Sequence, residues 1–180
     1  MNEKRFFEET VSSTMVYKGR IVNVHKDRVK SAKGSFSREI VEHPGAVVIV
    51  PVIGKSIVMV RQFRYAAKKT MLELPAGTLE KDEDPEDCAR RELIEETGYK
   101  AGSLRKMLKF YVAPGYDTEN IHAYLATNLV KTEQRLEKDE DIEVLEINID
   151  DLTHMIEENK IDDAKTIIGI MFYQHLMNQT

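Results

Sequence analysis

The pattern of apolar and polar residues divides most of the chain into segments typical of strands. Ala46 to Ile53 is a nearly continuous apolar run rich in β-branched residues, which predicts a strand buried on both faces. The pair Gly54-Lys55 leads into a second apolar run from Ser56 to Tyr65, so the two segments are expected to form a β-hairpin. Further strands are expected at positions 71–74, 104–112, 122–128 and 142–149.

A helix is predicted from Pro85 to Thr97, because the residues at both ends match the preferences of helix termini. Asp84 is a good N-cap, and Pro85 suits the first helical position, where its missing N–H is not needed. Gly98 can adopt the left-handed conformation that commonly follows a helix. Two more helices are expected near positions 151–158 and 162–177, and the charged segment 131–141 is expected to be a mobile loop.

The N-terminal part of the chain has strand character but few large apolar residues. Short strands are expected at positions 15–17, 21–24 and 35–41, separated by turn signals. Such a segment cannot bury a core of its own, so we expect a small antiparallel sheet that leans on the rest of the chain or on a second subunit. The turn His43-Pro44-Gly45 then separates an N-terminal subdomain, residues 1–43, from a main domain, residues 44–180.

Composition places the chain among soluble globular proteins. Of its 180 residues, 42% are hydrophobic and 32% are charged, and no apolar run is long enough to cross a membrane. With 26 Lys and Arg against 31 Asp and Glu, the net charge of -5 argues against nucleic acid as the main partner. The single cysteine excludes an intramolecular disulfide, and no apolar run follows the first five residues, so a cytoplasmic protein is expected.

The candidate chemistry lies on one face of the predicted helix. Glu92 and Glu96 are one turn apart on that face, and Glu95 flanks them. Neighbouring carboxylates repel one another unless a cation compensates them, and Mg2+ or Mn2+ accepts carboxylate oxygens together with substrate phosphates. Arg91, four residues before Glu95, can hold that carboxylate as an ion pair. The turn Pro75-Ala76-Gly77 adds backbone carbonyls and a residue without Cβ, which suits a further metal ligand.

A pair of glutamates on a helix is in most proteins only a solvated face. Here, however, seven defined residues stand at fixed spacing between Gly77 and Tyr99, in the pattern Gly-x5-Glu-x7-Arg-Glu-U-x-Glu-Glu-x-Gly-U, where U is a bulky apolar residue. This pattern resembles the Nudix box, and every fixed position is matched. Tyr99 stands where an aliphatic residue is more usual, and we expect an adjustment of packing there rather than lost chemistry.

The resemblance extends over most of the chain and narrows to one branch of the Nudix superfamily. Ser37 to Val47, Arg61 to Tyr65 and Glu73 to Gly77 are similar to segments of the ADP-ribose pyrophosphatases, and so is Pro114, fifteen residues after the box. The resemblance implies an α/β fold, a Nudix-type α/β/α sandwich with a mixed sheet. The small N-terminal antiparallel β-subdomain would be added to it.

The resemblance also assigns roles to residues. Its metal ligands are Glu92, Glu95, Glu96 and the backbone carbonyl of Ala76. Arg91 resembles the arginine that orients these glutamates, and Glu83 resembles a glutamate that supports the site. Arg64 resembles a substrate-binding arginine, and Glu119 resembles a glutamate that contacts the terminal sugar. Arg61 lies three positions from Arg64 on a predicted strand, so at most one of the two can reach the phosphate site.

The general base in this branch is a glutamate of the late loop. Glu140 is the best match here, with Glu137 and Asp139 as open alternatives. In relatives the N-terminal strands are exchanged between the subunits of a homodimer and help to hold the nucleobase. The candidates for that contact are Tyr17, Phe36 and Arg38.

The implied activity is that of a metal-dependent pyrophosphatase, with Mg2+ or else Mn2+ as its cofactor. It would cleave ADP-ribose or a related nucleoside diphosphate sugar to a nucleoside monophosphate and a sugar phosphate. GDP-mannose, another nucleotide sugar or a nucleoside polyphosphate are alternative substrates, and Pro114 favours a sugar. A Nudix-like domain that senses a ligand without turning it over is a further alternative, against which the intact set of carboxylates argues.

Overall fold

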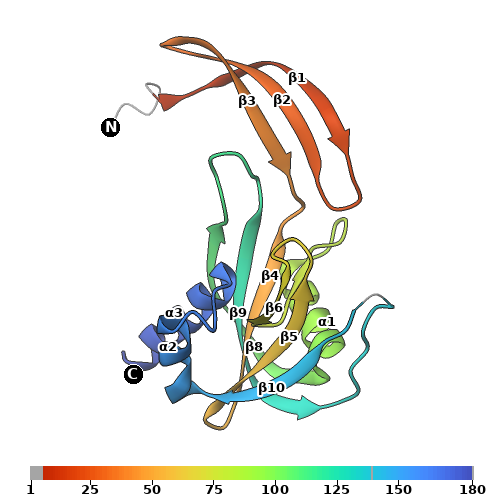
Figure 1. Cartoon of the computed structure of the whole chain (residues 1–180), viewed down its shortest axis with the longest axis vertical. Helices are drawn as coiled ribbons and strands as arrows, with labels where there is room; N and C mark the ends of the chain where they lie inside the picture. The colour runs from red at the N-terminus through yellow and green to blue at the C-terminus, as the bar shows by residue number, and fades with distance from the viewer. Residues whose placement is uncertain (1–5, 139, 180) are drawn as a thin grey trace. The chain divides into compact units, whose positions relative to one another are not determined.

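The computed structural model describes residues 6–138 and 140–179, which group into two compact units (Figure 1). The N-terminal unit comprises Met1–Gly45 and Tyr111–Asn120, and the C-terminal unit comprises Ala46–Phe110 and Ile121–Thr180. Among the described residues, no helix combines the length and the apolar character that crossing a membrane requires.

The N-terminal unit is built on a three-stranded antiparallel sheet in the order β1-β2-β3. Its strands are β1 (Glu9–Lys18), β2 (Asn23–Ser31) and β3 (Gly34–Glu42). They are longer than expected, because backbone pairing continues through polar residues that show no apolar alternation. Residues of Tyr111–Asn120 bind to β3: Val41 donates its N–H to the Tyr116 carbonyl, and Thr118 donates to the Val41 carbonyl. β1 is exposed along its whole length, so this sheet has no substantial core of its own.

The C-terminal unit contains a mixed seven-stranded sheet with β4 at its centre. The main path runs β10-β5-β4-β9-β8, while β6 pairs with β5 and β7 pairs with β4. β4 is parallel to β9 and antiparallel to β5, which makes the sheet mixed. The strands are β4 (Ala46–Ile53), β5 (Ser56–Arg64), β6 (Lys69–Glu73), β7 (Ala76–Thr78), β8 (Tyr99–Tyr111), β9 (Asn120–Lys131) and β10 (Glu143–Asn148).

Helices pack on both faces of this sheet. They are α1 (Pro85–Thr97), α2 (Ile149–Glu157) and α3 (Ala164–Met177). Side chains alternate along β4, so Val47 joins a buried cluster that includes Leu93 of α1. Val48 faces the opposite way and joins the cluster that includes Leu152 of α2 and Ile170 of α3. The expected α/β/α sandwich is therefore confirmed.

In the sheet of the C-terminal unit, two strands differ most from the expectation. β7 was expected to be a turn, because its three residues show no periodicity and pair with β4 only through their backbone. β8 begins at Tyr99, directly after α1, and not at position 104. In its first residues, buried Tyr99 and Ala101 alternate with exposed Lys100 and Gly102. Lysine and glycine are uncommon in strands, so the sequence did not predict a strand here.

Candidate active site

The helix α1 is fixed at both ends by the predicted caps. The Asp84 side chain accepts the N–H of Glu86, and Gly98 takes the left-handed conformation with φ of 68°. Ala89 and Leu93, which are one helical turn apart, are fully buried against the sheet. With its ends and its buried face fixed, α1 presents its glutamates in one defined direction.

Glu96 is the most buried carboxylate on this helix, with 3% of its surface exposed. The backbone N–H of Ala76, the first residue of β7, donates to the Glu96 Oε2 at 3.0 Å. Burial, with a smaller contribution from the charge of Glu92, raises the pKa of Glu96 to about 8. The Ala76 N–H and the charge of Arg64 offset part of this effect, and a cation placed next to Glu96 would stabilise the ionised form further.

Glu92 lies directly against Gly77 of β7. A Cβ atom on Gly77 would be 1.9 Å from the carboxyl carbon of Glu92, a separation that no side chain can adopt. Burial raises the pKa of Glu92 as well. Because Gly77 has no Cβ, it leaves the space that the Glu92 carboxylate occupies.

Arg91 connects the carboxylates of the site. Its Nε and Nη2 donate to the two oxygens of Glu83 at 2.9 and 3.0 Å. Its Nη1 donates to Glu92 at 2.7 Å and to Glu95 at 2.9 Å. The hydrogen bonds from Arg91 lower the pKa of Glu83 to about 2, so Glu83 stays ionised and keeps the guanidinium in place.

The donor set of this cluster fits a hard divalent cation. Its groups are carboxylate oxygens and backbone atoms of β7, which Mg2+ and Mn2+ prefer. The cradle at Gly77 and the buried Glu96 supply the space and the uncompensated acid that such an ion needs. Within residues 6–138 and 140–179, no three Asp, Glu, His or Cys side chains already converge on one point. In the arrangement seen here, Arg91 is the counter-charge of Glu92 and Glu95.

The late loop is attached to the C-terminal end of α1. The Gln134 side chain donates to the Glu96 carbonyl at 2.6 Å, and the Arg135 N–H donates to the Glu95 carbonyl at 3.0 Å. These bonds satisfy carbonyls that have no partner within the helix. The sequence carried no signal for this contact, because a glutamine in a polar loop looks like any solvated residue.

Glu140 is close enough to the carboxylates of α1 for its charge to act on them. Its charge contributes to the raised pKa of both Glu92 and Glu96. Its own Oε2 accepts the N–H of Glu137 at 2.8 Å, while Glu137 is exposed. The third candidate base, Asp139, lies outside the described residues.

Of the two arginines on β5, Arg64 is the one near the carboxylates. Its guanidinium binds Glu73 through two hydrogen bonds, at 2.6 and 2.8 Å, and the charge of Glu96 contributes to its raised pKa. Arg61 instead pairs with Glu143 of β10 at 2.8 Å. The two side chains thus go to different partners.

Three expected substrate contacts lie on the N-terminal sheet. The Arg38 guanidinium lies 5.6 Å from the centre of the Phe36 ring and binds Glu8, with Nε to Oε2 at 3.0 Å. In the sheet register, Phe36 is opposite Val29 of β2, whereas Tyr17 is opposite Val24. Val24 and Val29 are five residues apart, which corresponds to about 17 Å along the strand. Within one copy of the sheet, Tyr17 and Phe36 are therefore too far apart to contact the same nucleobase.

Glu119 belongs to the N-terminal unit through the segment Tyr111–Asn120. Its N–H donates to the Asp117 side chain at 2.8 Å, and its carboxylate lies 3.9 Å from the His43 Nδ1. His43 Nδ1 also accepts the N–H of Gly45 at 3.1 Å. Glu119 is therefore held by neighbours in its own unit.

The unusual tyrosine of the box has a partner. The Tyr99 ring is buried, and its hydroxyl donates to Glu146 of β10 at 2.7 Å. The adjustment expected at this position is a tether between the end of α1 and the edge strand.

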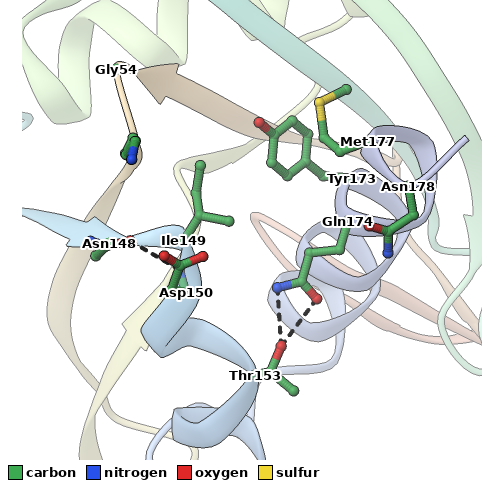
Figure 2. Close-up of a pocket in the computed structure, with 10 residues that line it drawn as sticks. Gly54, Asn148, Ile149, Asp150, Thr153, Tyr173, Gln174, Met177 and Asn178 are labelled. Atoms are coloured by element: carbon green, nitrogen blue, oxygen red, sulfur yellow. Dashed lines mark hydrogen bonds between the residues drawn. The ribbon is translucent and has the colours of Figure 1, made fainter. Parts of the chain in front are cut away.

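A hollow of about 590 Å³ lies elsewhere in the C-terminal unit (Figure 2). Figure 2 shows hydrogen bonds between Thr153 of α2 and Gln174 of α3, two of the residues that line it. Its lining shares no residue with the carboxylate cluster and consists of Gly54, Lys55, Asn148, Ile149, Asp150, Thr153, Tyr173, Gln174, Met177 and Asn178.

Sequence relatives cover most of the chain. It is 41% identical over 175 residues to the ADP-ribose pyrophosphatase of Bacillus subtilis (strain 168), and 40% identical over 175 residues to the methanol dehydrogenase activator of Bacillus methanolicus. Each match covers 95% of both chains. The GDP-mannose pyrophosphatase of Shigella flexneri serotype 5b (strain 8401) is 41% identical over 137 residues, 69% of this chain and 70% of the relative.

The fold is also shared with a solved crystal structure, that of an ADP compounds hydrolase. The TM-score is 0.85 at 18% sequence identity, over 96% of this chain and 95% of the other. The family pattern described as "NUDIX domain" matches residues 42–168, which include the whole carboxylate cluster. Together with the identities above, this match shows that the chain belongs to the Nudix family.

Proposed function

We propose that this chain is a metal-dependent pyrophosphatase. It hydrolyses ADP-ribose or a related nucleoside diphosphate sugar to a nucleoside monophosphate and a sugar phosphate. The observation that carries the proposal is the set of three glutamates on α1, seated against the glycine of β7 and joined by one arginine. The names of the Bacillus subtilis and Shigella flexneri relatives support this substrate class.

The carboxylates of α1 hold the cofactor. Nudix hydrolases generally use divalent metal ions, and for this chain we propose Mg2+, with Mn2+ as a substitute. Glu92, Glu95 and Glu96 would bind it together with the backbone carbonyl of Ala76. When bound, the cation neutralises the diphosphate and lowers the pKa of a water molecule. Arg91 donates hydrogen bonds to both Glu92 and Glu95 and so holds the two carboxylates close together. This lowers the conformational entropy that the two ligands lose when the ion binds.

Two further residues act on the substrate. Glu140 accepts the proton of the attacking water, for which its carboxylate turns away from the Glu137 N–H. Glu137 is the alternative base in the same loop. Arg64 donates hydrogen bonds to the phosphate oxygens and offsets their charge.

The N-terminal unit contributes the nucleobase and sugar contacts, in a homodimer. The sheet exposes large apolar side chains, namely Val11, Met15, Val16, Tyr17 and Phe36, which a second copy of the chain would cover. We therefore treat residues 1–43 as a subdomain for dimerisation and base binding, with Tyr17, Phe36 and Arg38 as substrate contacts. Glu119, in the segment Tyr111–Asn120, is the further substrate contact, to the terminal sugar. Residues 44–180 form the hydrolase domain. The single cysteine and the net charge of -5 favour a cytoplasmic protein that binds no nucleic acid.

Light scattering tests the dimer. The expected mass is twice the 20.7 kDa of one chain, and Val16→Asp on the exposed strand is expected to reduce it to one chain. A wild-type mass near one chain would contradict the dimer.

Product identification tests the activity. The purified chain is incubated with ADP-ribose, GDP-mannose, other nucleotide sugars, ATP and a dinucleoside polyphosphate, each with Mg2+ or Mn2+. Release of AMP and ribose 5-phosphate from ADP-ribose is expected, and faster cleavage of GDP-mannose would change the substrate within the same class. If every compound stays intact with both metals, the proposed hydrolase activity is contradicted. The alternative function is then activation of another enzyme, as in the name of the Bacillus methanolicus relative.

A further inference from the structure

We infer that Glu73 and Lys165 are positioning residues for Arg64, and that they hold its guanidinium in the orientation that binds the substrate phosphates. The inference deepens the proposed function and rests on it. It concerns three charged side chains from β5, β6 and α3, all within the C-terminal unit.

The central group is the carboxylate of Glu73, at the end of β6. Only 1% of its surface is exposed, and an isolated ionised carboxylate at such a depth is costly. Two cations compensate it: Arg64 binds both of its oxygens, and the Lys165 Nζ lies 2.5 Å from its Oε2. These partners lower the pKa of Glu73 despite its burial, so the group is charged in the folded protein.

The position of Arg64 shows that Glu73 sets its direction. In the register of β5 and β6, Arg64 is opposite Lys69, whereas Glu73 is opposite Val60. Four residues along a strand correspond to about 13 Å. The Arg64 side chain therefore reaches back along the sheet toward the end of β6, which leads into Ala76 and the carboxylates of α1.

Lys165 fixes Glu73 from the first turn of α3. Its Nζ also binds Asp163 at 2.9 Å, and Asp163 is the N-cap whose side chain accepts the N–H of Thr166. Thr166 in turn accepts the N–H of Leu74 at 2.9 Å. Two successive residues of the chain, Glu73 and Leu74, are thus bound to one helix turn. Lys165 is mostly buried, with 17% of its side chain exposed, and both its contacts are carboxylates of this cluster, so it acts through Glu73 rather than on substrate.

Arg64 keeps donors for the substrate. A guanidinium has five N–H groups, and Glu73 takes one from Nε and one from Nη2. The side chain is 39% exposed, and within the described part of the chain Glu73 is the acceptor that the structure gives it. The remaining N–H groups thus have a fixed direction, which lowers the entropy lost when they bind phosphate oxygens.

The first test is a pair of substitutions with a matched control. Glu73→Gln keeps the shape but removes the charge, and Lys165→Met keeps the apolar stem. We expect Glu73→Gln to lower kcat/KM by about 10-fold or more, mostly through a higher KM, and Lys165→Met to have a smaller effect of the same kind. Lys69→Met is the control and should leave kcat/KM unchanged. Lys69 is on β6, the strand of Glu73, but its ion-pair partner is Asp162, which is not one of the groups that bind Glu73.

The deciding test combines Glu73→Gln with Arg64→Ala in a double-mutant cycle on the whole chain. If Glu73 acts through Arg64, Glu73→Gln should change kcat/KM by less than about 2-fold once Arg64 is gone. The inference would be overturned if Glu73→Gln lowered kcat/KM equally in both backgrounds. It would also be overturned if Glu73→Gln lowered the melting temperature but left KM unchanged. Should Glu73→Gln fail to fold, the same cycle with Lys165→Met decides between the same two outcomes. Turnover by the wild type is measured first, so failure of the proposed hydrolase activity is separate from failure of the positioning role.

Discussion

The Glu92 carboxylate occupies the space that a Cβ atom on Gly77 would need. The separation would be 1.9 Å to its carboxyl carbon, and equally 1.9 Å to its Oε1. The atoms that this Cβ would meet all belong to the Glu92 side chain, so a side chain at position 77 requires the Glu92 carboxylate to move. The glycine of the box is thus a condition for the position of one metal ligand, in addition to any role in the turn.

Gly77→Ala is therefore expected to displace Glu92. A displacement of about 1 Å at a metal ligand corresponds to a loss of about 100-fold in kcat/KM. Steady-state kinetics with ADP-ribose and Mg2+ would measure the loss. Gly54→Ala is the control, because Gly54 has a φ of 58° and open space around it. It should cost about 1 kcal/mol of stability but leave kcat/KM unchanged, and comparable kinetic losses in both variants would contradict the steric account.

Tyr99→Phe should weaken the protein without affecting turnover. It removes the hydrogen bond to Glu146, at an expected cost of about 1 kcal/mol in the free energy of unfolding. The hydrogen bond to Glu146 raises the pKa of Tyr99 above its ordinary value of 10. This contribution to stability is fully present below pH 10 and is lost as the pH rises through the folded-state pKa. Urea unfolding of both proteins from pH 7 to 11 measures it, and a difference that grows with pH would contradict the assignment.

The late loop should depend on Gln134. Gln134→Ala frees the Glu96 carbonyl and loosens the segment that carries Glu140. We expect kcat to fall by about 10-fold, because the base is then less often in place, while metal binding changes little. Gln179→Ala, near the end of the chain, is the control of the same type. Unchanged kcat in Gln134→Ala would show that the loop needs no such attachment.

Local signals in the sequence were sufficient to predict the helix α1 and both of its ends. Asp84, Pro85 and Gly98 define both ends, and the glutamates follow from the helical period. The buried strand β4 was equally clear, since its apolar run reflects helices on both sides.

Contacts between distant segments were not predictable in the same way. Arg64, Glu73 and Lys165 meet because β5, β6 and α3 are brought together by the fold, and none of the three carries a sign of its partners. The same holds for Gln134, whose carbonyl partner exists only at the end of a folded helix. The hydrophobic periodicity of a segment indicates which of its faces is buried. It does not indicate which charged side chains of other segments lie next to it.

The most direct test of the account is cation binding at the glutamates of α1. Calorimetric titration with Mn2+ or Mg2+, in the presence of a substrate analogue that cannot be cleaved, is carried out on the wild type, Glu96→Gln and the control Glu86→Gln. Glu86 lies on the same helix but is exposed and paired with Arg90. We predict saturable binding to the wild type and to Glu86→Gln, and a loss of at least about 10-fold in affinity for Glu96→Gln. No cation uptake by the wild type, or equal uptake by all three proteins, would contradict the account.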